Sequence, residues 1–494
     1  MPMILHILSH LAFLSVAVLL ASTVPADLLG QAQEAVLVLG FLGAWRYSWA
    51  GINVTRAVIF RFFRYPRRKA AAQARYDAQS VDAHAFFLVT SYMIESSVTV
   101  PVYRSIFLAA ANATNGATIV SSVVDGSDAR LIQQIFDSMP IDMSRVNLIV
   151  DRIPGTGKRD ALAKSLNLIA RQSPTRHDIV LFVDGDSCVP EDIVAQTAPF
   201  FTNPAIGALT TDEEVEIEQP GLFRDWFELR FDQRQLMMCS MGLSNRVLTL
   251  TGRMSVFRAD LATNPDFINS VQHDFIDHWR LGRVNFLTGD DKSTWFWLMK
   301  NGYQMAYLPD VASSSMETQP KPSFFASATV LMVRWFGNML RTNGRALELP
   351  ASQIGYFTWW SILDQRLSMW TTLAGPICMI IAAIFYDPMV IPVYLAWVMF
   401  TRYVFCTGIC LFRGRSFPII YPFLLYFGQL FGAAVKTYVL FRLDRQKWTR
   451  QVTATGAPVR QSLGQRVGAA GSAYLHLLTL GWLTVAVLFL TGVI

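Results

Sequence analysis

Charged residues are scarce in this chain of 494 residues, since Asp, Glu, Lys and Arg together make up only 16%. A typical soluble domain carries about 25%. Hydrophobic residues reach 52%, and the mean hydropathy is +0.32. These values argue against a wholly soluble protein and indicate that part of the chain lies in lipid. The net charge of +6 would suit nucleic acid, but the basic residues cluster beside apolar segments, which is the membrane pattern.

Cysteine is also rare, and no CxxC pair occurs. Two of the five cysteines are spaced i,i+4 and would share a helix face, but both lie in an apolar run. The spacing therefore predicts neither a disulfide framework nor a zinc site. All five are interpreted as reduced and structural: Cys188, Cys239, Cys378, Cys406 and Cys410.

Long apolar runs occur at both ends of the chain, and each approaches the ~20 residues that a membrane-spanning helix needs. They predict two N-terminal transmembrane helices within residues 1–55, further ones within 367–441, and one within 471–494. Residues 350–366, with Trp359 and Trp360, suggest an interfacial segment. The first run lacks a positive start, which favours an anchor over a cleaved signal peptide, although Val24-Pro25-Ala26 is a tolerable cleavage site.

The basic residues predict the orientation of the chain in the membrane. A cluster from Arg56 to Lys69 follows the second apolar run, so the segment after it is expected in the cytosol. Arg413, Arg415 and the basic loop 442–470 are also expected there, yet one apolar stretch lies between them. Either that stretch folds back, or one of the two basic loops lies outside.

Residues 83–343 have the composition and the alternating polar and apolar pattern of a soluble domain. Short apolar runs at 85–91, 117–124, 147–150 and 178–183 read as strands, and a helical pattern covers 159–171. Nearly continuous apolar strands alternating with helices predict a parallel, doubly wound α/β sheet. Ligands of such sheets bind beyond the carboxyl ends of the strands, where the polar motifs of this chain lie.

The strongest motif is LFVDGDS, in which Asp184 and Asp186 end a buried strand. Alternate residues of an extended segment point the same way, so both carboxylates can face one divalent cation, Mg²⁺ or Mn²⁺. Such a cation neutralises charge on a departing nucleotide diphosphate. The alternative interpretation is an acidic turn after a strand.

A glycine-rich turn leads into Lys158 and Arg159 at a predicted helix start. It is not a Walker A loop, because Lys158 is followed by Arg159 and not by Ser or Thr. Two cations at a helix start still suit a phosphate group, and the alternative is a solvated basic helix start.

A third motif, Thr288-Gly289-Asp290-Asp291-Lys292, offers a carboxylate that can deprotonate a sugar hydroxyl. A helix N-cap is the alternative, and the two roles are compatible. Three weaker motifs are Gly252 to Ser255, the Arg334-Trp335 pair and the basic aromatic loop Lys447 to Gln451, each of which also fits a membrane-interface anchor. His273, Asp274 and His278 are read as structural, since residues five apart share no helix face.

The order of these motifs resembles that of the processive family-two glycosyltransferases of membranes, which include cellulose, hyaluronan and chitin synthases. The likeness covers essentially the whole chain. It implies an α/β cytosolic GT-A-like glycosyltransferase domain inserted between α-helical transmembrane segments of a bacterial inner-membrane protein. It also implies a nucleotide-sugar donor, a growing polysaccharide and contact with membrane lipid.

The resemblance also implies roles for single residues. Asp184 and Asp186 would hold the metal, with Asp184 also facing the donor, and Asp291 beside Asp290 would be the general base. The remaining expected substrate contacts are Thr90, Tyr92, Glu95, Asp125, Lys158, Arg159, Arg253, Lys292, Arg334 and Trp335, together with Trp448, Thr449 and Arg450 of a gating-type loop. One departure is Leu331, which stands where the QxxRW motif has its glutamine, so the acceptor contact of that glutamine is absent.

Within the family the chain resembles the alginate synthase catalytic subunits, the mannuronan polymerases. This implies GDP-mannuronate as donor, β-1,4-polymannuronate as product, an inverting single displacement, and a PilZ-domain co-polymerase that senses cyclic-di-GMP. The alternatives are a hyaluronan-, chitin- or cellulose-type synthase using a UDP-sugar, and a non-processive polyprenyl-phosphate glycosyltransferase. A further alternative, a transporter or membrane scaffold with an inactive domain, would not explain why Asp184, Asp186 and Asp291 occur together in the order of the family.

Overall fold

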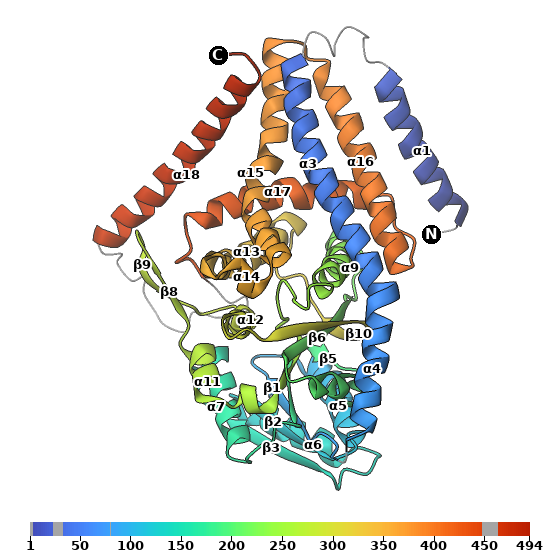
Figure 1. Cartoon of the computed structure of the whole chain (residues 1–494), viewed down its shortest axis with the longest axis vertical. Helices are drawn as coiled ribbons and strands as arrows, with labels where there is room; N and C mark the ends of the chain where they lie inside the picture. Colours follow the sequence, from blue (N-terminus) through green and yellow to red (C-terminus); the bar gives the residue numbers. More distant parts are fainter. Residues whose placement is uncertain (1–2, 23–32, 80, 447–462) are drawn as a thin grey trace.

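The computed structural model describes residues 3–22, 33–79, 81–446 and 463–494. An α/β domain occupies one end of the molecule and long helices occupy the other (Figure 1). The α/β domain is built on an eight-stranded sheet of order β3-β2-β1-β4-β7-β6-β10-β5. Its strands are β1 (Ala85–Thr90), β2 (Ala117–Val123), β3 (Val146–Arg152), β4 (Ile179–Asp184), β5 (Ser187–Cys188), β6 (Ile206–Glu216), β7 (Met254–Arg258) and β10 (Gln304–Met316).

The first half of the sheet is parallel, as the sequence predicts. Strands β3, β2, β1 and β4 pair in parallel, and their bounds agree with the predicted runs to within one or two residues. The prediction of an all-parallel sheet is wrong beyond β4, because β7 runs antiparallel to both β4 and β6. An antiparallel strand needs no crossover helix, so the alternation of strand and helix that suggested the parallel sheet stops there.

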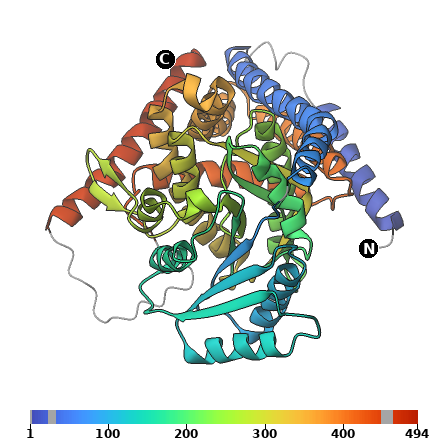
Figure 2. The same cartoon turned by 60° about the horizontal axis from the view of Figure 1, so that its bottom comes forward.

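Helices cover both faces of the parallel half. Helices α5 (Ser96–Ala111) and α6 (Gly126–Asp137) carry the chain from β1 to β2 and from β2 to β3, whereas α7 (Lys158–Ala170) returns it to β4. Because such crossovers are right-handed, the return places α7 on the opposite face. In Figure 2, with this end of the molecule forward, the cyan segments near residues 117–152 form its outer edge.

The second half of the domain contributes shorter elements and one long helix. Helix α9 (Leu222–Gly242) packs against β6 and β10. The other elements are α8 (Ile193–Thr197), η2 (Ala198–Thr202), α10 (Ala259–Ala262), α11 (Pro265–Gln272), α12 (Asp290–Lys300) and the hairpin of β8 (Phe275–His278) with β9 (Gly282–Asn285). Helices α13 (Phe324–Glu348) and α14 (Ala351–Ile354) lead to the helical end.

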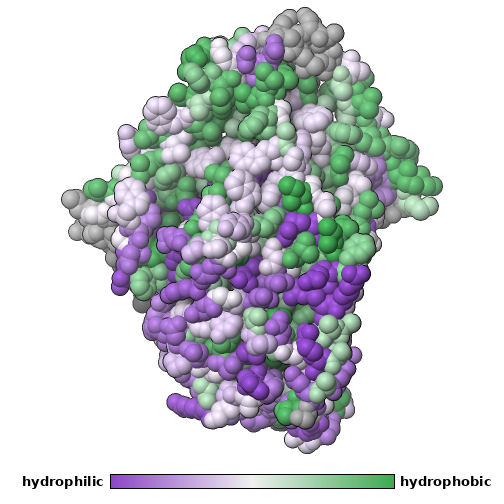
Figure 3. Space-filling view, viewed as in Figure 1, coloured by the Kyte–Doolittle hydropathy of each residue, from purple (hydrophilic) through white to green (hydrophobic). Residues whose placement is uncertain are grey.

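Six helices of the described chain are long and apolar enough to cross a membrane. They are α1 (Met3–Ser22), α3 (Gln33–Val58), α15 (Tyr356–Phe385), α16 (Val390–Arg413), α17 (Tyr421–Leu440) and α18 (Leu463–Leu490). Helix α3 continues through the π-helical η1 (Ile59–Arg64) into α4 (Tyr65–Asp77), which lies beside the α/β domain. Figure 3 shows apolar side chains gathered over the helical end and polar ones over the α/β domain.

Helix α17 lies differently from the others. It runs across the view of Figure 1, whereas α3, α15 and α16 run along it, and it packs against α9 and α13 as well as α15 and α16. Both ends are tied to the α/β side. Arg413 and Arg415, just before α17, form ion pairs with Asp232 of α9, and Arg280 donates to the carbonyl oxygen of Phe441 at 2.7 Å.

A charged pair lies inside the helical end of the molecule. Arg46 of α3 donates to Asp364 of α15, with 2.6 Å between Nη1 and Oδ1. A long cation within an apolar segment can snorkel to the headgroups, but here it has a carboxylate partner on a neighbouring helix. Asp364 belongs to α15, a continuous helix that begins at Tyr356.

Candidate active site

The predicted site residues meet where the parallel strands end. Thr90 closes β1 and pairs in register with Asp184, the last residue of β4. Gly185 follows, and a Cβ at this position would lie 2.8–3.0 Å from Ile94, Thr90 and Ser91. No side chain fits there, so glycine lets the chain turn tightly between Asp184 and Asp186.

Lys158 joins two of the motifs. Its ammonium group, at the start of α7, lies 2.6 Å from Oδ1 of Asp184 and 3.1 Å from Oδ2 of Asp290. Gly252 faces the same cluster, since a Cβ built on it would be 3.5 Å from Asp184 and 3.6 Å from Lys158. Asp184 and Asp290, which lie far apart in the sequence, thus join Lys158 in one charged cluster.

Burial and the neighbouring charges shift the pKa values of the carboxylates in this cluster. Burial raises the pKa of Asp184 to about 7 against the opposing charge of Lys158, and Asp186 and Asp290 add to the rise. Burial would also raise the pKa of Asp290, but Lys158 and Arg159 outweigh it and hold that pKa below its ordinary value. Two neighbouring carboxylates with opposite pKa shifts are typical of acid–base sites.

Asp291 lies beside this cluster on α12. Its pKa is raised, first by burial and then by the charge of Asp290. The hydroxyl of Thr249 lies 3.3 Å from Oδ2 of Asp291 and 2.6 Å from the carbonyl oxygen of Leu250, so two acceptors share its single proton. Gly289, just before, has a φ of 82° and packs against Asn338, so the start of α12 needs glycine. A carboxylate with a raised pKa is a stronger base than an ordinary one.

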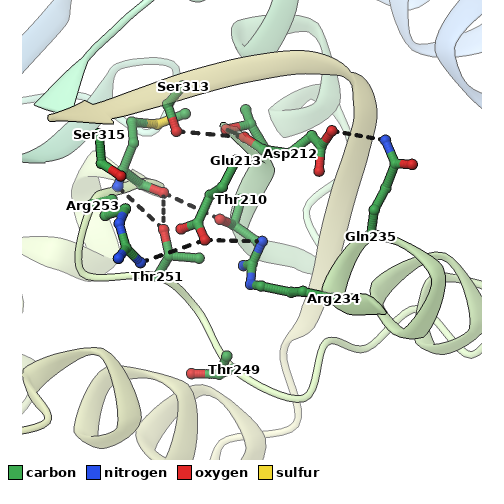
Figure 4. Close-up of polar contacts among 12 residues, drawn as sticks. Thr210, Asp212, Glu213, Arg234, Gln235, Thr249, Thr251, Arg253, Ser313 and Ser315 are labelled. Carbon is green, nitrogen blue, oxygen red and sulfur yellow. Dashed lines mark hydrogen bonds and ion pairs between the residues drawn. The ribbon is translucent and has the colours of Figure 1, made fainter. Parts of the chain in front are cut away.

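Arginines and glutamates form a second group on the side of β6 and β10 (Figure 4). Arg253 lies 2.7 Å from Oε1 of Glu317 and 3.6 Å from Oε2 of Glu213. Glu213 is only 1% exposed and also faces Arg234 at 3.4 Å. Burial works against the charge of Arg253, but Glu213 and Glu317 raise its pKa beyond the ordinary value.

Arg334 and Trp335 come from α13. The guanidinium of Arg334 is within electrostatic reach of Glu317, Arg253, Asp184 and Asp186, although burial is the largest influence and lowers its pKa. Trp335 stacks on Trp226 of α9 with 5.8 Å between ring centroids. This region closes the site on the side of α9, α13 and α17.

Two predicted contacts take other partners in the structure. Arg159 is buried and donates to the carbonyl oxygens of Val271 and Thr288 and to Ser293, so it ties α7 to α11 and α12 and does not reach the open side of the cluster. Lys292 donates to the carbonyl oxygen of Leu248 at 2.7 Å. Burial lowers the pKa of Lys292 to about 8.

Other predicted contacts lie at the rim or beyond it. Tyr92 and Glu95 follow β1 and are exposed, and Asp125 is the exposed N-cap residue of α6 after β2. Leu331 is buried among apolar residues of α9 and α17, so that position offers no polar contact. The loop 447–451, with Trp448, Thr449 and Arg450, lies outside the described residues.

The carboxylates fit a divalent cation. Within the described ranges, no group of three Asp, Glu, His or Cys is arranged to hold a metal ion. Asp184 and Asp186 lie on either side of a glycine, and the ammonium of Lys158 already contacts one of them as a cation would. Mg²⁺ is commonly bound by one or two carboxylates plus substrate phosphates. This donor set therefore suits a cation that arrives with a diphosphate.

Residues 84–338 match the family model described as "Glycosyltransferase like family 2". The chain is 42% identical over 446 residues to "Glycosyltransferase alg8" of Pseudomonas syringae pv. tomato (strain ATCC BAA-871 / DC3000), covering 90% of both chains. It is also 42% identical over 450 residues to "Glycosyltransferase alg8" of Azotobacter vinelandii, again covering 90% of both. The chain therefore belongs to the family-2 glycosyltransferases and, within them, to the Alg8 group. This confirms the resemblance drawn from the motifs, and the chain is an enzyme of this class.

Solved structures are more distant. A mannosyltransferase of Pyrobaculum calidifontis in complex with GDP-Man and Mn²⁺ aligns over 78% of this chain and 98% of its own, with 15% identity and a TM-score of 0.41. S. aureus TarS 1-349 in complex with UDP-GlcNAc aligns over 72% and 90%, with 12% identity and a TM-score of 0.37.

Proposed function

We propose that this chain polymerises mannuronate from GDP-mannuronate into β-1,4-polymannuronate, the precursor of alginate, and passes the product across the bacterial inner membrane. The observation that carries the proposal is the meeting of Lys158, Asp184 and Asp290 in one charged cluster with Asp291 at its edge. The Alg8 relatives and the family-two motif order support glycosyl transfer. The donor, the processivity and the export are inferred from the resemblance.

In this proposal each charged residue has a defined task. Lys158 neutralises the diphosphate, and Asp184 and Asp186 hold Mg²⁺ or Mn²⁺. The cation, when bound, stabilises the charge that develops on the departing GDP. Asp291 accepts the proton of the acceptor hydroxyl while that oxygen attacks the anomeric carbon from the face opposite the leaving group, which inverts the configuration.

The helical end supports a membrane enzyme with its α/β domain in the cytosol. We assign the crossings to α1, α3, α15, α16 and α18, with α17 lying at the membrane surface against α9 and α13. The residues before and after α17 then lie on the same side as the α/β domain, in agreement with their basic character. The C-terminus lies on the opposite side, as its place in Figure 1 suggests.

Single cysteines test this topology in intact cells. Ser416→Cys and Asp444→Cys, both exposed positions flanking α17, are expected to react with a membrane-permeant maleimide only. Ile494→Cys, at the exposed end of the chain, is expected to react with an impermeant reagent as well. Labelling of positions 416 and 444 from opposite sides would show that α17 crosses the membrane.

Donor specificity tests the function itself. Membranes containing the chain are incubated with radiolabelled GDP-mannuronate, UDP-glucuronate or UDP-GlcNAc, and the products are separated by size and by solubility in organic solvent. We expect polymer from GDP-mannuronate alone. Polymer from a UDP-sugar alone would overturn the donor assignment, and lipid-linked monosaccharide would indicate a non-processive transferase. The family resemblance also implies a PilZ-domain co-polymerase, so the assay is run with and without cyclic-di-GMP and membranes that contain that partner.

A further inference from the structure

One helix of the α/β domain carries a stripe of aromatic and cationic residues that the sequence motifs did not reveal. Trp226, Arg230 and Arg234 are spaced four residues apart on α9, so they follow one another on a single face. This face meets Trp335 of α13 at one end and Glu213 of β6 at the other. The stripe therefore runs along the side of the site opposite Lys158, between the α/β domain and α17.

Arg230 has no carboxylate partner in the described part of the chain. Its guanidinium lies 4.1 Å from the ring centroid of Trp335 and 5.2 Å from that of Trp226. Burial lowers its pKa to about 10, and the nearby charge of Arg253 adds to the effect. A guanidinium that is partly desolvated and stacked on two indoles can still donate hydrogen bonds from its N–H groups to a ligand bound beside the rings.

The guanidinium of Arg234, one turn further along α9, has only a long ion pair and few polar contacts in the part of the chain that the structure describes. Its Nη1 lies 3.4 Å from Oε2 of Glu213, and within the described residues neither Nη1 nor Nη2 makes a hydrogen bond although both atoms are buried (Figure 4). Glu213 is shared with Arg253, and both of its oxygens also lack hydrogen bonds there. Buried donors without acceptors are costly, so such groups usually await a ligand or water.

The charges on this side do not balance. Arg234 and Arg253 share Glu213, and Arg253 also pairs with Glu317 and lies within electrostatic reach of Asp186, whereas Arg230 has no carboxylate partner in the described part of the chain. Two of the cations expected from the sequence to contact the substrate are engaged elsewhere, since Arg253 pairs with Glu317 at 2.7 Å and Lys292 donates to the carbonyl oxygen of Leu248. An anionic ligand on the α9 face would supply the missing counter-charge.

We propose that Arg230 and Arg234 bind the carboxylates of the uronate residues at the acceptor end of the polymer. Arg230 takes the carboxylate of a sugar stacked beside Trp335, and Arg234, one turn further along α9, takes that of a neighbouring sugar on the Glu213 side. This assignment rests on the proposed function and adds the residues that select an acidic product. A planar guanidinium suits this task because it binds a carboxylate through two parallel hydrogen bonds.

The test compares acidic and neutral acceptors. The full-length enzyme in detergent or nanodiscs is given GDP-mannuronate with either oligomannuronate or its carboxyl-reduced counterpart, oligomannose, and the KM of each acceptor is measured. For Arg230→Gln and Arg234→Gln we expect the KM of the acidic acceptor to rise about 10- to 100-fold, as for loss of a charge-assisted hydrogen bond. The neutral acceptor should change little.

A matched control and a conservative pair complete the design. Arg224→Gln lies on the same helix, is exposed and pairs with Glu228, so it should leave both acceptors unaffected. Arg230→Lys and Arg234→Lys keep the charge but lose the paired hydrogen bonds, so an intermediate preference is expected even if the Gln variants do not fold. Equal effects on both acceptors, or an unchanged preference in folded Gln or Lys variants, would overturn the inference. A wild-type enzyme that makes no polymer from GDP-mannuronate would instead overturn the proposed function.

Discussion

The two sides of the site differ in how the chain builds them. The Lys158 side consists of short motifs that each follow a strand or start a helix, and parallel strands bring such motifs to one edge. The α9 side consists of single residues on a long helix that faces β6, α13 and α17 only after the whole domain has folded. In the proposed function the first side binds phosphate and metal, which need clustered charges, and the second binds a chain of sugars, which needs an extended surface.

The largest expected effect is at Asp291, which lies between the two sides. Replacing Asp291 with Asn keeps its shape but removes the proton acceptor, so polymerisation should fall about 10²- to 10⁴-fold. Donor binding, measured by equilibrium dialysis of labelled GDP-mannuronate, should persist because Lys158, Asp184 and Asp186 remain. Asp277→Asn, at an exposed pair with Arg283, is the control and should retain activity. Substantial activity in Asp291→Asn would rule out this residue as the base.

The next effect concerns Lys158 alone. Lys158→Gln removes the cation that contacts Asp184 and Asp290 and is expected to weaken donor binding about 10- to 100-fold. Lys164→Gln, on the same helix and paired with Asp160, serves as the control in the same dialysis experiment. If the affinity for the nucleotide sugar stayed unchanged, the assignment of Lys158 to the diphosphate would be wrong.

Metal dependence should vary with pH on the Lys158 side. The pKa of Asp184 is about 7 without metal, so between its ordinary value and 7 the folded protein holds a proton that the unfolded chain has released. The metal-free protein therefore loses stability as the pH rises through 7. Mg²⁺ competes with this proton, so the half-saturating Mg²⁺ concentration should rise up to about tenfold from pH 7 to pH 6. Thermal unfolding of wild type and Asp184→Asn at both pH values, with and without Mg²⁺, measures this, and identical pH profiles would contradict it.

The smallest expected effect is at Thr249, which contacts the base. Thr249→Val removes the hydroxyl that lies 3.3 Å from Asp291 and 2.6 Å from the carbonyl oxygen of Leu250, and it should lower kcat about two- to tenfold with little change in donor affinity. Thr263→Val, which loses only a bond to a backbone carbonyl in α10, is the matched control. A drop in kcat as large as that of Asp291→Asn would mean that Thr249 does more than position the base.

The sequence predicted the Lys158 side because its signals are local. An apolar run ending in Asp-Gly-Asp, or a glycine before two cations, is visible in a window of a few residues, and the structure brings Asp184, Lys158 and Asp290 together. Whether a side chain becomes buried depends on parts of the chain that are distant in the sequence. Arg159 was assigned to the diphosphate beside Lys158, yet successive residues on a helix point about 100° apart, and Arg159 faces α11 and α12.

The α9 side escaped prediction for a physical reason. Arg230 and Arg234 are ordinary surface-like cations at helical spacing until β6, the turn before β7 and α13 place Glu213, Arg253 and Trp335 around them. The antiparallel β7 was also missed, since antiparallel strands lack the crossover helix that marked the others. Similarly, the apolar composition of α17 suits a membrane crossing as well as the position at the membrane surface that we propose from its contacts with α9 and α13.

A single paired measurement tests the division of the site most directly. GDP-mannuronate binding and polymer formation are measured on the same preparations of wild type, Lys158→Gln and Arg230→Gln in the presence of Mg²⁺. The account predicts that Lys158→Gln loses both, whereas Arg230→Gln binds the donor like wild type and fails to extend the acidic polymer efficiently. Equal loss of donor binding in the two variants would contradict it.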